Sequence, residues 1–382
     1  MNDISWSSLI HGLTRLPLLE VFDLIPQAVR QIDHCDLYLW DHQRRTLASM
    51  RTGARFDSPD ELTDQPHSSG VIVRVSHQGD DLGFLACSMN DVATDDLSLI
   101  ADLVGAALRA NVASTDVINM RRRSAEMSLA AEMQWELLPP MQFSTADAWV
   151  SAAVEPAYDT GGDIFDYALN EGRLSLSVLD ARGHGLRAAT TAAVATSAMR
   201  RARRQGDSLV DTAAEIGSAV AALGDEQEFV TAVLAEVDLQ SSIVTWLCAG
   251  HLAPLIVGER VKTLPLTPAL PLGLMVGGRT SEPVEQRFRL EAGQSLVLYS
   301  DGIIENVALD IGESLGDERF HHILEDRLPN HRVEDASIPI ARTVVEDLLA
   351  LTGAALRDDA TVLIAQSCSE RNRPQSARAP DS

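Results

Sequence analysis

The stretch Leu-Ser-Leu-Ser-Val-Leu-Asp-Ala-Arg-Gly-His-Gly, residues 174–185, joins an apolar run to a carboxylate and a glycine-rich bend. The run over Leu174–Leu179 predicts a β-strand that ends just before Asp180. Gly183 and Gly185 allow the chain to bend tightly and allow a ligand to come near the backbone. Asp180 is therefore the first residue of a candidate site.

Three further aspartates stand in similar turn-like settings: Asp163 in Thr-Gly-Gly-Asp, Asp301 in Tyr-Ser-Asp-Gly and Asp358 in Arg-Asp-Asp-Ala-Thr. Each alone is more simply a turn former, because aspartate and glycine tolerate unusual backbone angles. Four converging carboxylates, however, would repel one another unless divalent cations lay between them. Together they predict an all-oxygen site for two Mn²⁺ or Mg²⁺ ions and metal-assisted hydrolysis of a phosphate ester.

Composition limits the alternatives. A chain of 382 residues suggests two or three domains, and 45% hydrophobic with 23% charged residues is typical of a globular protein. The net charge of −24 argues against nucleic acid as a partner. We find no apolar stretch of about 18 residues or more and no signal-peptide pattern, so we expect no membrane span. The four cysteines lack metal-site spacing and fit free thiols in a reducing cytoplasm.

The first segment, residues 1–115, predicts a small α+β domain. Helical spacing runs over Leu18–Ile32, with Pro26 expected to kink it, and strands are expected over Cys35–Trp40, Thr46–Met50, Val71–Val75 and Gly83–Ser88. A helix over Asp95–Asn111 closes the segment. This order of elements resembles a GAF-type sensor domain.

The closing helix is expected to continue as a linker over 116–140, because Gly105 is the only glycine and no proline intervenes between Leu103 and Leu138. A heptad seam of mostly small apolar residues over 103–138 predicts a weak parallel coiled coil, and hence a homodimer. A helix packed on its own domain explains the same pattern equally well. Pro139-Pro140 ends the helix.

From about residue 145 onward, strand-like runs dominate, and two pairs of helices are expected among them: Leu186–Arg204 with Ser208–Leu223, and Glu318–Leu328 with Ile338–Leu351. This order predicts a sandwich of sheets with helices outside, and an α+β fold class for the whole chain. The polar, proline-containing segment 368–382 predicts a disordered tail.

Motifs over about residues 125–367 resemble, in family order, the metal-dependent serine/threonine phosphatase (PPM) family, and most closely its bacterial SpoIIE/RsbU branch. Two positions depart from the family pattern: Ile164-Phe165 replaces Phe-Tyr, and Arg182 stands where a small or uncharged residue is usual. The motifs are Leu137–Pro139, Glu155–Ala157, Gly161–Asp166, Asp180–Ala189, Phe229–Ala232, Ala249–His251, Leu272-Gly273, Tyr299–Glu305 and Asp358–Thr361.

The resemblance implies an αββα sandwich over 141–367 and assigns the metal ligands. Asp180 would bridge both ions, Asp163 and the carbonyl of Ala181 would complete one, and Asp301 and Asp358 would bind the other. A water molecule between the ions would lose a proton near neutral pH and attack phosphorus.

Other candidates have simpler explanations. His184 lies beside the metal loop and could assist the leaving group, although a loop-ordering role is preferred; His251 is interpreted as a structural histidine. Asp166 and Asp359 are expected to support the ligands or form turns. The arginines at 200, 201, 203 and 204 could bind phosphate, but cations are favoured at the end of a helix. Arg121-Arg122-Arg123 is interpreted as a solvated face.

The resemblance implies a phosphoserine or phosphothreonine substrate on a STAS-type anti-sigma antagonist, in a partner-switching pathway. One alternative is an inactive phosphatase-fold module that senses a signal and sequesters a partner. Loss of a ligand aspartate would favour that alternative, and all four are present. Another is a sensor whose phosphatase is weak until activated.

Overall fold

The computed structural model describes residues 5–15, 18–29, 32–63, 71–89, 94–112, 114–158, 161–224, 227–278, 280–309, 312–329, 339–353, 356 and 358–368. The chain divides into two compact units, Met1–Glu126 and Met127–Ser382, each described below by itself. No helix in the described ranges is long and apolar enough to span a bilayer. The tail predicted over 368–382 lies almost wholly outside the described residues.

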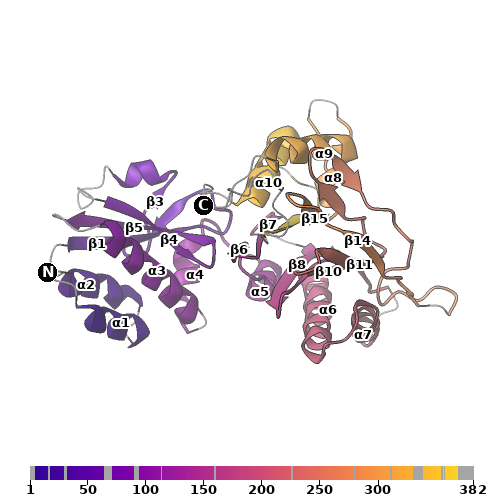
Figure 1. The fold of residues 1–382 in the computed structure, drawn as a ribbon, viewed down its shortest axis with the longest axis horizontal. Helices are drawn as coiled ribbons and strands as arrows, with labels where there is room; N and C mark the ends of the chain where they lie inside the picture. The colour runs from indigo at the N-terminus through magenta and orange to yellow at the C-terminus, as the bar shows by residue number, and fades with distance from the viewer. Residues whose placement is uncertain are drawn as a thin grey trace, which may run out of the picture. The chain divides into compact units, whose positions relative to one another are not determined.

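The first unit is built on a five-stranded antiparallel sheet with the order β3-β2-β1-β5-β4. Helices α1, α2 and α3 bury apolar residues such as Leu9, Ile25 and Ile100 against one face of the sheet (Figure 1). The other face carries an aromatic cluster that includes Trp40 and Phe84. The elements are α1 (Trp6–Arg15), α2 (Leu18–Ala28), β1 (Ile32–Trp40), β2 (Leu47–Ser49), β3 (Arg55–Phe56), η1 (Pro59–Leu62), β4 (Val71–His77), β5 (Asp80–Met89), α3 (Thr94–Asn111) and α4 (Val117–Arg122).

The continuous helix predicted over 103–138 is wrong, because α3 ends at Asn111 and α4 covers only Val117–Arg122 before α5 begins at Leu129. Polar side chains near the breaks bond the local backbone in place of helical partners. The Asn111 amide donates to the Ala107 carbonyl at 2.8 Å, and the Ser128 hydroxyl caps α5 by accepting from the Ala131 N–H at 3.2 Å. The residues of the predicted coiled-coil seam therefore do not lie on one helix. The seam residue at position 113 falls outside the described residues.

The alternative explanation of the heptad pattern, a helix packed on its own domain, holds for α3. Its Val104 and Leu108 are buried in the core of the first unit. The arginines of α4 are also not the solvated face that we expected. The Arg122 Nε–H donates to the Trp40 carbonyl at 2.7 Å, and Arg55 donates to the carbonyls of Arg121 and Arg123.

The second unit is a sandwich of two antiparallel sheets, ordered β14-β11-β10-β9-β8 and β13-β12-β15-β16-β7-β6. Alternate residues of each strand face inward, so that Val178 and Trp246 of one sheet share a core with Leu298 and Leu363 of the other. The strands are β6 (Gln142–Ser144), β7 (Ala148–Glu155), β8 (Gly161–Asn170), β9 (Arg173–His184), β10 (Val230–Asp238), β11 (Ile243–Ala249), β12 (Leu255–Val257), β13 (Val261–Thr263), β14 (Gln286–Arg289), β15 (Ser295–Tyr299) and β16 (Ala360–Ser367).

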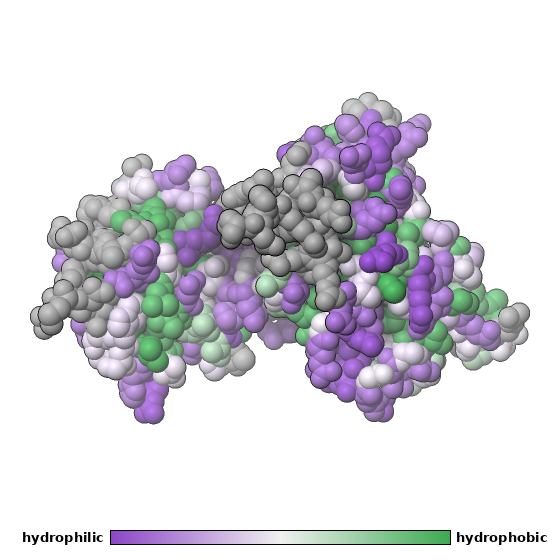
Figure 2. Space-filling view, in the orientation of Figure 1, coloured by the Kyte–Doolittle hydropathy of each residue, from purple (hydrophilic) through white to green (hydrophobic). Residues whose placement is uncertain are grey.

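Helices cover both outer faces of this sandwich (Figure 1). The alanines of α6, such as Ala188, Ala192 and Ala195, bring that helix close to the first sheet. Hydrophilic residues predominate on the visible surface over α6 and α7 (Figure 2), as expected for the solvent side of such a layer. The αββα arrangement and the α+β class are confirmed. The helices are α5 (Leu129–Leu137), α6 (Gly185–Gln205), α7 (Leu209–Ala221), α8 (Gly302–Glu305), α9 (Gly316–Arg327) and α10 (Ile340–Thr352).

Candidate metal centre

Two of the predicted ligands face each other across one strand pair. Asp163 of β8 and Asp180 of β9 are direct partners in the antiparallel register. Phe165 and Val178, two positions along each strand, lie in the core between the sheets. Because side chains alternate along a strand, both carboxylates point into the same interior space. Asp163 is only 3% exposed, so its charge is held away from water.

The other sheet supplies the remaining predicted ligands. Asp301 follows β15 and opens α8, and Asp358 and Asp359 directly precede β16. The two strand ends are tied together, because Ser300 N–H donates to the Thr361 carbonyl at 3.0 Å and Thr361 N–H donates to the Ser300 hydroxyl at 2.9 Å. Ligands from distant parts of the sequence are thus held at one end of the sandwich.

The pKa shifts show that these carboxylates form one electrostatic group. Burial, and then repulsion by Asp180 and Asp359, raise the pKa of Asp163 well above its usual range. Burial, and then repulsion by Asp301, Asp358 and Asp359, raise the pKa of Asp180 to about 7. The pKa of Asp301 is also raised, by burial and then by Asp358. Divalent cations between the carboxylates would relieve this repulsion.

Two glycines allow the backbones around the cluster to approach closely. A Cβ atom on Gly162 would lie 2.0 Å from the Ala181 carbonyl oxygen, and one on Gly302 would lie 1.8 Å from the Asp359 carbonyl oxygen. Neither position can accept a side chain without moving backbone atoms. Gly162 therefore keeps the space beside the Ala181 carbonyl, the predicted backbone ligand, free of any side chain.

Several residues that support the cluster were missed by our sequence predictions. The Gln134 amide of α5 donates to the Asp163 carbonyl, and hydrogen bonding from Thr231 lowers the pKa of Asp180. Ser300 and Thr361 face Asp163 and partly offset the rise in its pKa. Thr231, Ser300 and Thr361 could have been recognised in the sequence as hydroxyl residues in or next to an apolar strand, at positions that face inward. No such pattern marks Gln134.

The donor set fits Mg²⁺ or Mn²⁺. It consists of oxygen atoms alone, and Asp163 Oδ2 is buried without a hydrogen-bond partner among the described residues. In those same residues, no group of three acidic, histidine or cysteine side chains converges closely enough to hold an ion unaided. Mg²⁺ usually keeps several waters and takes few carboxylates, so this spacing suits ions held partly by water and by the Ala181 carbonyl.

Among the supporting aspartates, the structure separates two that we predicted together. Asp359 belongs to the cluster and accepts a hydrogen bond from Gly161 N–H at 2.5 Å. Asp166 instead faces α6, where Arg200 and Arg203 each contact its carboxylate at 2.8 Å. It therefore does not support the ligands. Since Arg201 pairs with Glu215, these three arginines have carboxylate partners and are not a phosphate site.

The two candidate histidines differ in environment. His251 is buried, its Nδ1 accepts from the Leu252 N–H at 2.7 Å, and burial lowers its pKa to about 4. It is therefore neutral near pH 7 and fits the structural role predicted for it. His184 is exposed at the end of β9, where it pairs with Gly161 in the strand register.

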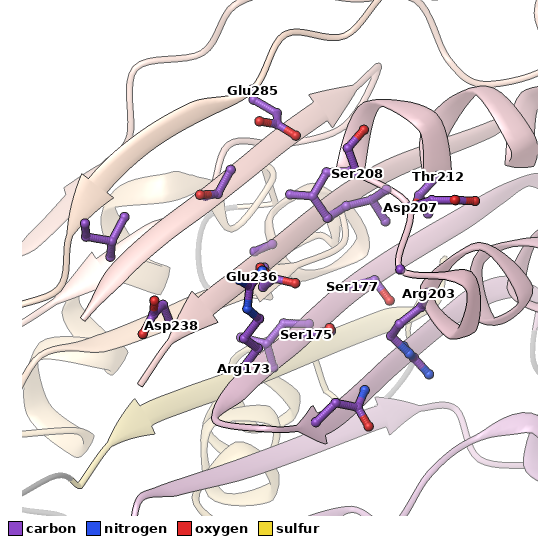
Figure 3. Close-up of a pocket in the computed structure, with 18 of the residues that line it drawn as sticks. Arg173, Ser175, Ser177, Arg203, Asp207, Ser208, Thr212, Glu236, Asp238 and Glu285 are labelled. Carbon is purple, nitrogen blue, oxygen red and sulfur yellow. The ribbon is translucent and has the colours of Figure 1, made fainter. Parts of the chain in front are cut away.

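A groove of about 930 Å³ lies elsewhere on the second unit, over the face of β9, β10, β11 and β14 beside the end of α6 (Figure 3). None of the predicted ligands lines it. Its charged residues are largely paired, as in Arg173 with Glu236 at 3.1 Å and Arg203 with Asp166 at 2.8 Å. Because the predicted ligands lie elsewhere, we do not assign the chemistry to this groove.

Comparison with known proteins identifies the family of the chain. The family model described as stage II sporulation protein E (SpoIIE) matches residues 170–367, more than half of the 382-residue chain. The matched range contains Asp180, Asp301 and Asp358 and begins after Asp163. A comparison with curated proteins found no match.

Solved structures of similar fold are also known. The chain is similar to the PP2C domain of SiaA from Pseudomonas aeruginosa, with 20% identity and a TM-score of 0.51 over 62% of this chain and 93% of that one. It is similar to the RsbU and RsbW domains of a Mycobacterium tuberculosis protein, with 24% identity and a TM-score of 0.49. That second match covers 58% of this chain and 60% of the other, so the chain spans less than two thirds of its length.

Proposed function

Because the chain belongs to the SpoIIE family of PP2C-type serine/threonine phosphatases, we propose that it removes phosphate from phosphoserine or phosphothreonine in a protein. The observation that carries the proposal is the buried Asp163, opposite Asp180, with a carboxylate oxygen that lacks a partner among the described residues. The resemblance to the SpoIIE/RsbU branch is confirmed by the family match. The likeness of the first unit to GAF domains remains a prediction.

In this proposal Asp180 would be a ligand of both ions. Asp163 and the Ala181 carbonyl would help hold one of them, and Asp301 and Asp358 would hold the other. Mn²⁺ or Mg²⁺ would supply the positive charge for activating a water molecule and stabilising the transferred phosphoryl group. The chain's own residues fix the ligands in place, because Gln134 holds the Asp163 carbonyl and Thr231 contacts Asp180.

The purified protein is expected to release phosphate from a phosphoserine peptide only when Mn²⁺ or Mg²⁺ is present. An excess of chelator should abolish the release, and added metal should restore it, because the site has no nitrogen or sulfur ligands that would retain an ion. A phosphotyrosine peptide serves as the control substrate and should be hydrolysed poorly. Full activity in excess chelator would exclude the metal mechanism.

We propose that the substrate is a phosphorylated STAS-type anti-sigma antagonist and that the protein acts in the cytoplasm. Support comes from the family match alone. The alternative is an inactive module that sequesters a partner. Loss of a ligand aspartate would favour it, but all four aspartates are present. Measuring phosphate release from a purified phosphorylated STAS-type protein would test the assignment directly.

We also propose that residues 1–115 form a sensor domain, 116–140 a linker, 141–367 the phosphatase domain and 368–382 a tail. The proposed homodimer through 103–138 now lacks the continuous seam that first suggested it, since that stretch forms separate helices. α5 instead belongs to the second unit, where Trp135 Nε1–H donates to the Ala157 carbonyl at 2.7 Å and the Gln134 amide donates to the Asp163 carbonyl.

A fragment beginning at residue 140 is expected to be monomeric and to turn over more slowly than one beginning at residue 127. The shorter fragment loses α5 and with it the hydrogen bond from Gln134 to the Asp163 carbonyl. Residues that position metal ligands typically contribute about 10–100-fold to activity. Sedimentation and metal-dependent turnover of both fragments and the full chain test this. Equal turnover of the two fragments would leave α5 as a passive spacer.

A further inference from the structure

Two cysteines in the core of the first unit are not used by the proposed function. Cys35 of β1 and Cys87 of β5 are direct partners in the antiparallel register, and their sulfur atoms lie 3.5 Å apart. Both side chains are fully buried in the core between the sheet and helices α1–α3. Both are free thiols in the structure.

This placement meets the requirements of a disulfide. Directly opposed residues of an antiparallel pair have Cα atoms about 4.5–5.5 Å apart, which lies inside the range of about 4.4–6.8 Å seen in disulfides. Closing the sulfur–sulfur distance to about 2.05 Å needs side-chain rotation and no change of register. The register shift between Ile32 and His34, just before Cys35, gives β1 some local freedom to adjust.

We propose that Cys35 and Cys87 are a redox-active pair that forms a reversible intramolecular disulfide with a peroxide as oxidant. One thiol is oxidised by the peroxide to a sulfenic acid with release of water. The second thiol then attacks that sulfur, the S–O bond breaks, and a second water leaves. Two thiols lose two hydrogens and two electrons in total, and the peroxide accepts them. A small-molecule dithiol reverses the reaction.

Packing alone would explain one buried cysteine, because a free cysteine behaves as a small apolar side chain. It does not require a second cysteine at the directly opposed position. Burial raises the pKa of the Cys35 thiol, so little thiolate forms at neutral pH and the reaction is slow without local opening. The nearness of the second thiol nevertheless favours a disulfide over further oxidation once a sulfenic acid has formed.

The cross-link would join the central strands of the sheet, between residues 52 positions apart in the sequence. A disulfide across such a loop restricts the unfolded chain. Oxidation should therefore raise the unfolding temperature of the first unit, by on the order of 10 °C for an unstrained bond.

The test treats the full-length protein with hydrogen peroxide, blocks remaining thiols in denaturant and maps the peptides by mass spectrometry. The expected result is a linked peptide pair containing Cys35 and Cys87, lighter than the two thiol peptides by about 2 Da, which disappears on reduction. Cys35→Ser and Cys87→Ser should each abolish it. Cys248→Ser, in the core of the second unit, and Cys368→Ser, at an exposed position, should each leave it unchanged.

The proposal is overturned if peroxide gives separate sulfinic acids at the two positions, or links either one only to Cys368. It is also overturned if both thiols remain alkylatable after prolonged oxidation. This outcome is measured on the wild-type protein, so it holds even where a serine variant does not fold. Thermal unfolding of oxidised and reduced wild-type protein provides the second readout, and an unchanged transition of the first unit would contradict a cross-link in its core.

Discussion

Replacing Asp180 with asparagine is expected to reduce metal-dependent turnover by more than about 100-fold while leaving the fold intact. Even residues that only position metal ligands contribute about 10–100-fold, and Asp180 is proposed to serve both ions. The new side chain has nearly the same shape but lacks the charge that would attract the cations. Turnover of a phosphoserine peptide at several metal concentrations, with circular dichroism to check folding, measures the effect. Asp301→Asn is expected to act in the same direction.

Two matched variants separate this effect from a general loss of acidic charge. Asp326→Asn removes an exposed carboxylate from α9 and should leave turnover unchanged. His184→Ala should cost far less than Asp180→Asn. A loss of about 100-fold or more for His184→Ala is the effect expected on removing a general acid, and it would promote His184 to a catalytic residue.

Without metal, the Asp180→Asn variant is expected to be more stable than the wild-type protein at pH 8, because burial and repulsion raise the pKa of Asp180 to about 7. An unfolded aspartate titrates near about 3.9. Between these values the unfolded chain releases a proton that the folded chain keeps, so wild-type stability falls as pH rises, by up to about 1.4 kcal/mol per pH unit. Below the pKa of the unfolded aspartate, the carboxyl group is protonated in both the folded and the unfolded chain. Asp180 then causes no loss of stability.

The quantity to measure is the difference in unfolding free energy between the variant and wild type, by denaturant unfolding at several pH values in chelator. We expect this difference to grow from about pH 4 to about pH 7 and then to level off, because the asparagine does not titrate. Saturating Mg²⁺ or Mn²⁺ should remove it, since the bound ion stabilises the ionised carboxylate. A difference independent of pH would mean that Asp180 is not held in a repulsive environment.

Much of the fold was predictable because local patterns matched the final environment. The strand expected over Leu174–Leu179 lies within β9, and the helix expected over Leu186–Arg204 matches α6 within a residue at each end. These segments are amphipathic or continuously apolar, so burial reinforces their intrinsic preference. The aspartates were recognisable as a set, since four carboxylates in similar settings are harder to explain as separate turns, but Asp163 and Asp180 lie within β8 and β9 rather than after a strand.

The predictions failed where tertiary contacts outweigh local pattern. The stretch 103–138 has neither proline nor a second glycine, yet it forms separate helices. The Asn111 amide donates to the Ala107 carbonyl at the end of α3, and the Ser128 hydroxyl accepts from the Ala131 N–H at the start of α5. Asp166 was expected to support the ligands or to form a turn, but it lies three positions after Asp163 on β8 and therefore on the opposite face of the strand. The bond from Gln134 to the Asp163 carbonyl joins residues 29 positions apart and leaves no periodic signal.

The place of β16 in its sheet has a consequence for how the protein is made. This strand, Ala360–Ser367, lies between β15 and β7 and pairs with both. During synthesis, β7 leaves the ribosome long before β16, its partner in the middle of the sheet. Asp163 and Asp180 of the other sheet are also translated before Asp358. A nascent chain therefore exposes two unpaired strand edges, which are templates for aggregation, and it has no complete metal site. The enzyme should thus become competent only after Asp358 and β16 have been made, and ribosome stalling before residue 358 should yield an aggregation-prone product rather than a partially active one.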